Sequence, residues 1–398
     1  ADSDIAQQIG CALEIWQSID EPPSDQTVTT RPASKDATRQ LFDEARLHER
    51  KSWAKSLPRD SRDTVLRQLE LAESLGPRRR VSTAPEAKSF DELDQSFPHF
   101  ERATAHFRRA AALARRTAER MFLATPCLLA GPPGVGKSAS ARALAGKLNA
   151  PVQFVDAASS TGFSLGGLDI GYSTGKAGRV WEALQNECMS PLVVVDELDK
   201  TADGNNPADS ALYTLLEPLT ARSFSDEAIG LPIDASCITW IATANDEQKI
   251  ESALRSRFVV IDIPQPTVAQ MYAVVQSINA SLLSDAPWAK SFPDELDRNV
   301  IEKLSTFTPR QAMQALRDAY ASAAERDSDR ICVDDVRPQS KTQRRVGFLC
   351  PARLEGQAHD LGRLAGRQGF SESAGLDRQV GRRVDHALGR RLLALPGA

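Results

Sequence analysis

The chain has 398 residues, which at roughly 100–200 residues per domain predicts two or three domains. Hydrophobic residues make up 41% and charged residues 26%, so the composition excludes collagen-like, disulfide-scaffold and wholly disordered proteins. The formal net charge of −4 gives no whole-chain basic excess of the kind that binds nucleic acid. No apolar run reaches the roughly 18–20 residues that a membrane helix needs.

The six cysteines are dispersed, with no Cys-x-x-Cys pair, and we expect buried or free thiols in a reducing compartment. The first residues, Ala-Asp-Ser-Asp-Ile, lack the positive start and the apolar core of a signal peptide. The sequence therefore predicts a cytoplasmic protein that has no membrane partner.

Residues 1–88 are predicted to form a helical N-terminal region that ends in a linker. Apolar residues recur near helical spacing over Ile5–Ile19, and a second helical stretch is expected around Ala37–Leu75. The segment Gly76–Pro85 then has glycine and proline residues at its ends, which is typical of a linker, and contains Arg78-Arg79-Arg80. These arginines could touch nucleic acid, but a solvated linker is the favoured interpretation.

Residues 89–265 are predicted to form an α/β domain. Glu101–Phe122 has the spacing of an amphipathic helix, and we interpret its six arginines as a solvated face rather than a DNA-binding surface. Short β-rich runs then alternate with helical segments, which is typical of a parallel sheet covered by helices on both faces. The runs are Cys127–Ala130, Val152–Val155, Leu192–Val195, Ile238–Thr243 and Phe258–Ile263.

Residues 266–337 are predicted to form a small α-helical lid domain, with helices at Val268–Leu283, Pro293–Phe307 and Arg310–Arg326. The remaining segment, 338–398, carries 11 Lys+Arg against 5 Asp+Glu and is rich in Gly and Arg. A flexible, disordered basic tail is one interpretation, and a shifted reading frame is the other. We assign no chemistry to this segment.

The strongest chemical signal is a phosphate-binding loop that matches G-x-x-x-x-G-K-[ST]. Its glycines allow successive N–H groups to face a phosphate, and the helix that follows presents its positive end. Lys137 is expected to reach the β- and γ-phosphates of a nucleotide, and Ser138 is expected to bind Mg²⁺. The predicted nucleotide-binding residues are Gly131, Pro132, Pro133, Gly134, Val135, Gly136, Lys137, Ser138 and Ala139.

Two carboxylates end the third apolar run, about sixty residues after this loop. Asp196 is placed to hold Mg²⁺, and Glu197 is placed to polarise the water that attacks the γ-phosphorus. Asn245, which follows the fourth run, could orient the same water. Together these residues predict a nucleotide triphosphatase, in which catalysis is mostly positioning and charge neutralisation.

Three arginines complete the predicted catalytic set. Arg255 and Arg257 precede the fifth run, and an arginine here can project from one subunit into the neighbour's nucleotide. The sequence leaves open which of the two does so. Arg310 begins a helix of the small domain and could reach the phosphates from the lid.

At these positions the chain resembles the AAA+ ATPases, and its core is similar to the ATPase module of Lon proteases. The similarity includes Leu165-Gly166-Gly167, Tyr172 to Arg179, Asp196–Lys200, Pro207–Pro218, Phe224-Ser225-Asp226 and Pro232-Ile233-Asp234. The resemblance implies a ring, usually a hexamer of identical chains, with the nucleotide between subunits and axial loops that grip a polypeptide. Tyr172 lines up with the aromatic residue of the family's first pore loop, between Gly171 and Gly175.

The sequence departs from the Lon pattern in two places. The 338–398 segment contains no serine–lysine dyad of the Lon protease domain, so we expect no peptidase activity from this chain. The stretch between Gly167 and Tyr172 is shorter than is usual in the family, which bears on the grip of the pore loop.

The sequence thus predicts a P-loop α/β fold with a helical lid and a Mg²⁺-dependent AAA+ ATPase that remodels or unfolds protein substrates. One alternative is a nucleotide-gated binding or scaffold module with slow hydrolysis. Another is a DNA-directed AAA+ motor, although a nucleic-acid partner is not favoured.

Overall fold

The computed structural model describes residues 37–158, 165–171, 175–201 and 207–337. The predicted helix at Ile5–Ile19, the loop residue Tyr172 and the segment 338–398 lie outside the described residues. Within the described ranges, no helix is long and apolar enough to cross a lipid bilayer.

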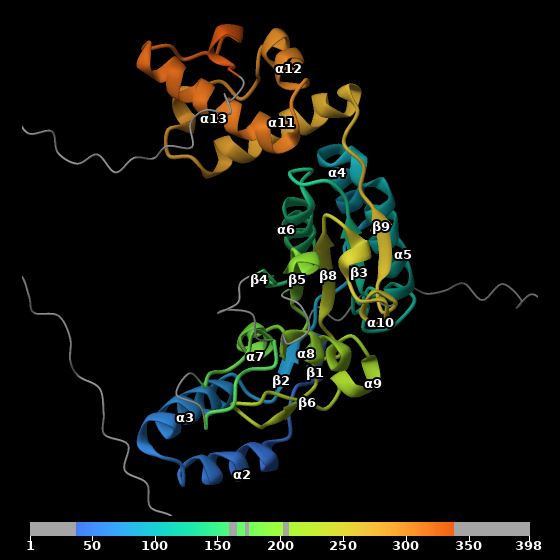
Figure 1. Cartoon of the computed structure of the whole chain (residues 1–398), viewed down its shortest axis with the longest axis vertical. Helices are drawn as coiled ribbons and strands as arrows, with labels where there is room; N and C mark the ends of the chain where they lie inside the picture. Colours follow the sequence, from blue (N-terminus) through green and yellow to red (C-terminus); the bar gives the residue numbers. More distant parts are fainter. Residues whose placement is uncertain (1–36, 159–164, 172–174, 202–206, 338–398) are drawn as a thin grey trace, which may run out of the picture. The chain divides into compact units, whose positions relative to one another are not determined.

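A five-stranded sheet forms the centre of the described fold, and all its strand pairings are parallel. In spatial order the strands are β4 (Val152–Asp156), β5 (Leu192–Asp196), β8 (Thr239–Ala244), β3 (Cys127–Ala130) and β9 (Val259–Asp262) (Figure 1). The five apolar runs are therefore confirmed as strands of a parallel sheet. Because β3 and β5 both pair with β8, the loops that leave their carboxyl ends meet at one edge of the sheet.

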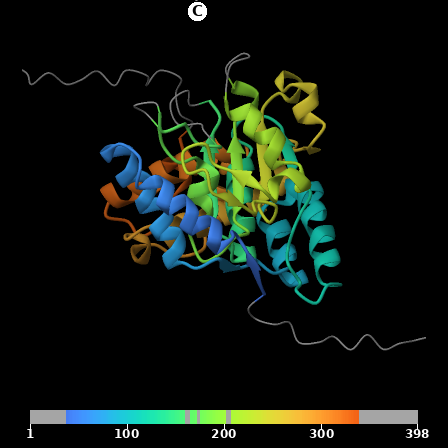
Figure 2. The same ribbon diagram turned by 90° about the horizontal axis from the view of Figure 1, so that it is seen from below.

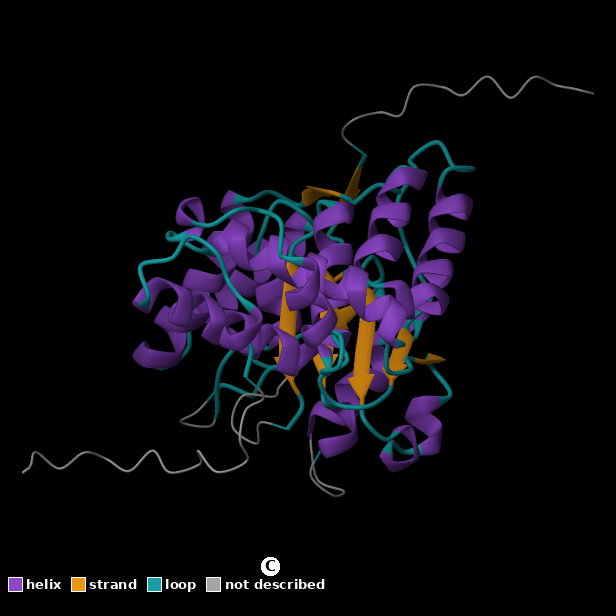
Figure 3. Ribbon diagram, turned by 90° about the horizontal axis from the view of Figure 1, so that it is seen from above, coloured by secondary structure: helices purple, strands orange, loops and turns teal. Residues whose placement is uncertain are grey.

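The strands alternate between two hydrophobic clusters, as expected for strands buried on both faces. In β5, Val193 and Val195 belong to the first cluster, whereas Leu192 and Val194 belong to the second. Helices supply the other side of each cluster, so helices surround the strands (Figure 3). The first cluster is covered by α2 (Glu44–Ala54), α3 (Arg59–Ser74), α7 (Arg179–Leu184) and α8 (Pro207–Leu215), the second by α4 (Ala87–Ser96), α5 (Glu101–Ala114) and α6 (Lys137–Leu148).

The segment Gly76–Pro85 is not the solvated linker that its composition predicted. Arg78–Arg80 forms strand β2, which pairs antiparallel with β1 (Thr38–Gln40). The side chain of Arg79 is only 2% exposed and donates to the carbonyl of Ala72 over 3.1 Å. The prediction was wrong because pairing with a distant strand and burial under α3 decide this segment, not its local composition.

The N-terminal helices α2 and α3 share a core with the sheet. Leu47 of α2 and Leu69 of α3 are buried in the same cluster as Val193 and Val195 of β5. Figure 2 shows these two blue helices on the side of the strands opposite to α4 and α5. The predicted boundary at residue 88 therefore does not separate two hydrophobic cores.

The predicted helix Glu101–Phe122 ends earlier than its pattern suggested. Helix α5 stops at Ala114, and Arg120 has a positive φ of 51°, which an α-helix does not allow. The turn after α5 brings Phe122 back into the second cluster, where it is 1% exposed. Burial of this ring, rather than the helical spacing before it, sets the end of the helix.

A third hydrophobic cluster holds the lid helices together. The predicted helix at Pro293–Phe307 begins only at Arg298, because the side chain of Asp297 accepts the N–H of Asn299 and caps the helix. Thr308 and Gln311 form a capping box that starts the last lid helix. The lid helices are α11 (Val268–Asp285), α12 (Arg298–Leu304) and α13 (Pro309–Glu325).

Short elements complete the described fold. They are α9 (Pro218–Ala221), β6 (Phe224–Ser225), β7 (Pro232–Ile233) and α10 (Ser252–Arg255), together with the 3-10 turns at Pro98–Phe100, Leu198–Lys200, Glu247–Lys249, Ala289–Ser291 and Val333–Asp335.

Candidate nucleotide-binding site

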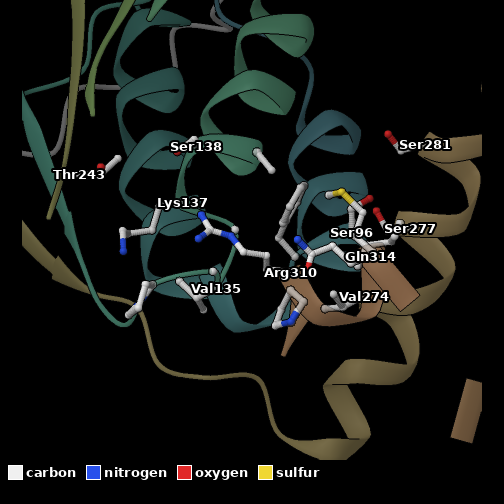
Figure 4. Close-up of a pocket in the computed structure, with 18 of the residues that line it drawn as sticks. Ser96, Val135, Lys137, Ser138, Thr243, Val274, Ser277, Ser281, Arg310 and Gln314 are labelled. Carbon is white, nitrogen blue, oxygen red and sulfur yellow. The ribbon is translucent and has the colours of Figure 1, made fainter. Parts of the chain in front are cut away.

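A cavity of about 1030 Å³ opens where the carboxyl ends of β3, β5 and β8 meet the lid helices α11 and α13 (Figure 4). Cavities that bind small ligands have volumes of roughly 300–1,000 Å³, so this one has room for a nucleotide. Residues 133–139 of the predicted phosphate loop line it, as do Asp196, Glu197, Asn245 and Arg310. The structure thus brings most of the predicted site residues to one cavity.

Two glycines of the loop leave no room for a side chain. A Cβ on Gly131 would lie 2.3 Å from the carbonyl oxygen of Ile263. Gly134 has a φ of +78°, and a Cβ there would lie 3.0 Å from the Cβ of Arg310. The loop therefore passes close to both the sheet and the lid, and helix α6 begins at its end with Lys137. A helix N-terminus after a glycine-rich turn is a general anion-binding arrangement.

Lys137 and Arg310 are two cations that face this cavity (Figure 4). The ammonium group of Lys137 donates to the carbonyls of Gly131 (2.7 Å) and Pro132 (3.2 Å) and to Oδ1 of Asn245 (3.0 Å). Burial lowers the pKa of Lys137, nearby carboxylates oppose this shift, and the charge of Arg310 adds to it. Two cations against one cavity wall suit a polyphosphate.

The predicted magnesium ligands lie side by side. The hydroxyl of Ser138 donates to Oδ2 of Asp196 over 2.9 Å. Thr243 donates its hydroxyl to Oδ1 of the same carboxylate and accepts the N–H of Glu197 over 3.1 Å. Hydroxyl and carboxylate oxygens are the ligands that Mg²⁺ prefers, so the residues fit this ion. Among the described residues, no group of three or more His, Cys, Asp or Glu side chains is placed to hold a metal ion.

Glu197 adopts a backbone conformation that is uncommon for a residue other than glycine, with φ 57° and ψ 43°. Its carboxylate pairs with the ammonium group of Lys200 over 2.8 Å. One oxygen of Asp199 accepts the N–H groups of Asn245 (3.2 Å) and Asp246 (3.1 Å). Strained backbone of this kind clusters at functional sites, and here it places Glu197 beside the cavity.

Among the predicted residues that the structure describes, four do not line this cavity: Gly131, Pro132, Arg255 and Arg257. Arg255 donates to the carbonyl of Glu247 (3.1 Å) and to Oε1 of Gln248 (3.0 Å). Arg257 donates to the carbonyl of Ala253 over 2.7 Å, and its guanidinium lies 4.8 Å from the centre of the Tyr213 ring. A role for either arginine towards a neighbouring subunit stays a prediction, and Tyr172 lies outside the described residues.

Several residues of the site were not predicted. Thr243 is the last residue but one of the buried strand β8, which pairs with β5, and this position is a signal that sequence reasoning could have used. Arg317 also lines the cavity, and its place seven residues after Arg310 on α13 puts both on one helix face. Lys200 lies within the quoted Lon-like motif, but nothing there pointed to an ion pair with Glu197.

His99 also lines the cavity, and no sequence motif predicted this. Its Nε2 lies 2.9 Å from the carbonyl of Val135, and because a carbonyl only accepts, Nε2 must carry the proton. Burial lowers the pKa of His99, which favours the neutral ring. His99 therefore supports the phosphate loop from behind as a neutral hydrogen-bond donor.

Residues 127–265 match the model of a family described as the ATPase family associated with various cellular activities (AAA). The chain carries an AAA+ module. The module is similar to the ATPase part of Lon proteases. It is 38% identical over 145 residues to the peroxisomal Lon protease homolog 2 of Caenorhabditis briggsae, a match that covers 33% of this chain and 18% of that protein.

The Lon protease of Paraburkholderia phytofirmans is 32% identical over 193 residues, which cover 44% of this chain and 22% of that protein. The chain therefore spans about a fifth of the length of these relatives. A solved complex of S. cerevisiae Hsp104 with casein aligns with a TM-score of 0.49 and 14% identity, over 65% of this chain and 50% of that chain. A point mutant of Thermotoga maritima RuvB aligns with a TM-score of 0.42 and 20% identity, over 61% of this chain and 70% of that chain.

Proposed function

We propose that this chain is a Mg²⁺-dependent ATPase that couples ATP hydrolysis to the remodelling or unfolding of protein substrates. The observation that carries the proposal is the meeting of two cations, a hydroxyl–carboxylate pair and a second carboxylate in one cavity. The similarity of this chain to Lon proteases over 145 and 193 residues supports a polypeptide as the substrate.

Each residue of the cavity has a role in the proposed reaction. The N–H groups of the loop, Lys137 and Arg310 would bind the phosphates of ATP and offset their charge. Ser138 and Asp196 would hold Mg²⁺, which neutralises charge on the β- and γ-phosphates when bound. Glu197 would orient the attacking water and accept its proton, and the amide of Asn245 would help to align that water.

The proposal includes assembly into a ring, as the family resemblance implies. Neither Arg255 nor Arg257 lines the cavity of its own chain, which supports an action across a subunit boundary. Each guanidinium already has partners in its own chain, Glu247 and Gln248 for Arg255 and Ala253 and Tyr213 for Arg257. A mixing experiment that takes Arg257 first therefore decides between them. We propose that these 398 residues have no peptidase activity. We also propose a cytoplasmic location.

Steady-state ATP hydrolysis with unfolded protein or with duplex DNA as the added effector tests the proposed substrate. We expect unfolded protein, and not DNA, to stimulate turnover. Tyr172→Ala should retain basal turnover and lose the stimulation. The contact of one aromatic ring with a polypeptide contributes only about 1–2 kcal/mol, so the rings of several subunits must bind together, and the variant removes all of them. Tyr172→Phe is the matched control, since it keeps the ring, and should retain the stimulation.

Other outcomes would favour other functions. Stimulation by DNA alone would favour the DNA-directed motor, and tight ATP binding with near-zero turnover would favour the scaffold module. A Tyr172→Ala protein that responds to unfolded protein as the wild type does would remove this residue from substrate binding.

A further inference from the structure

Asp226 is a fully buried carboxylate that the proposed hydrolysis does not use. It follows strand β6 and is 0% exposed. Its Oδ1 accepts the N–H groups of Ala228 (3.0 Å) and Ile229 (3.1 Å), which closes a tight turn. Its Oδ2 accepts the N–H of Gly178 over 2.7 Å, which ties this turn to a residue far away in the sequence. No ion pair joins Asp226 to a lysine or arginine among the described residues.

A buried carboxylate without a cation is costly, and here burial raises the pKa of Asp226 to about 6, although three backbone N–H groups act in the opposite direction. A neutral amide oxygen could accept the two N–H groups of the turn just as well. Only the second carboxylate oxygen serves Gly178. What an aspartate adds at this position is therefore the link to Gly178.

Gly178 belongs to the base of a hairpin, which we define as Gly167–Leu168 and Lys176–Gly178. Leu168 and Lys176 exchange backbone hydrogen bonds of 2.9 and 3.2 Å, so the two sides of the base are paired. A Cβ on Gly167 would lie 2.6 Å from Oδ1 of Asp226, and a Cβ on Gly178 would lie 2.2 Å from the nitrogen of Gly167. Both sides of the hairpin base therefore converge on one carboxylate.

Helix α7 connects the hydrogen bond between Asp226 and Gly178 to the sheet. Gly178 is the residue that precedes this helix, whose Val180 and Trp181 are fully buried in the first cluster. The N–H of Val180 donates over 3.3 Å to the carbonyl of Leu165, two residues before the hairpin base begins. Asp226 thus holds the hairpin base at the point where the chain enters the ATPase core.

The N-terminal helices contact both the turn closed by Asp226 and the hairpin. Arg50 of α2 donates to the carbonyl of Ile229, which lies in the turn closed by Asp226. Ser61 of α3 donates to the carbonyl of Ile170, within the hairpin, over 3.4 Å. The hairpin base is therefore fixed between the Asp226 turn and helices that precede the AAA+ module.

We propose that Asp226 is a positioning residue whose carboxylate fixes the hairpin base, and that this fixed base is required for unfolded protein to stimulate ATP hydrolysis. The second half rests on the proposed function. The first half, the fixing of the base, is a property of the chain that can be measured without any substrate.

Asp226→Asn isolates the link with little change in shape. The amide oxygen can keep the two N–H groups of the turn, but the amide nitrogen then faces the N–H of Gly178, and two donors cannot pair. We expect basal ATP turnover and the melting temperature to stay near wild type. Half-maximal stimulation should require about tenfold or more unfolded protein, since a hydrogen bond to a charged group is lost.

Asp234→Asn is the matched control. The carboxylate of Asp234 closes a similar turn by accepting the N–H (2.9 Å) and the hydroxyl (2.6 Å) of Ser236, and its hydrogen bonds reach no residue of the hairpin base. This variant should be stimulated as the wild type is. If both variants lost stimulation equally, or if Asp226→Asn lost basal turnover and melting temperature together, a general structural role would replace the proposal.

Amide hydrogen exchange separates the two halves of the proposal. In Asp226→Asn, the amides of Leu168, Lys176 and Gly178 should exchange faster, while those of β5 stay protected. Unchanged exchange at these amides would overturn the positioning role, even if the wild type were stimulated. Faster exchange in a protein that unfolded substrate never stimulates would support the positioning role and reject the proposed function.

If Asp226→Asn does not fold, amide exchange in the wild type still tests the hydrogen bond to Gly178. The Gly178 amide of the wild type should then be as protected as the strand amides of β5. Exchange at the rate of an exposed loop would contradict the link.

Discussion

Glu197→Gln is expected to bind ATP normally and to hydrolyse it about 10²-fold or more slowly, because glutamine keeps the shape of the side chain but cannot accept a proton. The pair between Glu197 and Lys200 is lost as well, but both side chains are more than 40% exposed, so this should change stability little. Single-turnover hydrolysis and ATP binding, measured on the same preparation, separate the two effects.

Glu302→Gln is a suitable control for this variant. Glu302 pairs with Arg298 on the exposed face of lid helix α12, away from the cavity, and its loss should leave hydrolysis unchanged. Equal single-turnover rates in Glu197→Gln and the wild type would show that another group activates the water.

Loss of Arg257 is expected to leave ATP binding intact and to depress hydrolysis by up to about 10³-fold, if the guanidinium completes the site of the next subunit. The sharper form of this experiment mixes two inactive proteins. Arg257→Ala retains its own phosphate loop, whereas Lys137→Ala retains the arginine. In mixed assemblies, some sites combine an intact loop with an intact arginine, so part of the activity should return.

A mixture of Arg298→Ala with Lys137→Ala is the reference, since Arg298 lies on the lid surface. It shows the activity expected when Lys137→Ala subunits only dilute subunits whose own site is intact. No recovery by Arg257→Ala in a mixture that demonstrably co-assembles would argue against a site shared between subunits. Recovery with Arg255→Ala but not with Arg257→Ala would assign the role to the other arginine.

The sequence predicted the sheet and the phosphate loop because both are local patterns. Runs such as Leu192–Val195 alternate between two buried faces, and the loop needs glycines at fixed spacing before Lys137. Asp196 and Asn245 could be placed as well, since parallel strands bring their carboxyl ends to one edge.

Contacts over long sequence distances decided what the sequence could not predict. Arg79 is buried because β2 pairs with β1, and nothing in a run of three arginines indicates that partner. His99 joins the site through the carbonyl of Val135. Asp226 stood within the Lon-like motif, but its link to Gly178 becomes visible only once the turn and the hairpin base are side by side.

Phosphate release by the full chain shows whether the cavity hydrolyses ATP with Mg²⁺, as we propose. Turnover should be measured with Mg²⁺, with excess EDTA, and in Lys137→Ala, which lacks the cation that faces the phosphates. We expect wild-type turnover that falls to the level of Lys137→Ala when the metal is removed. Turnover that is the same in the wild type and Lys137→Ala, or that is insensitive to EDTA, would show that this cavity is not a Mg²⁺-dependent ATPase site.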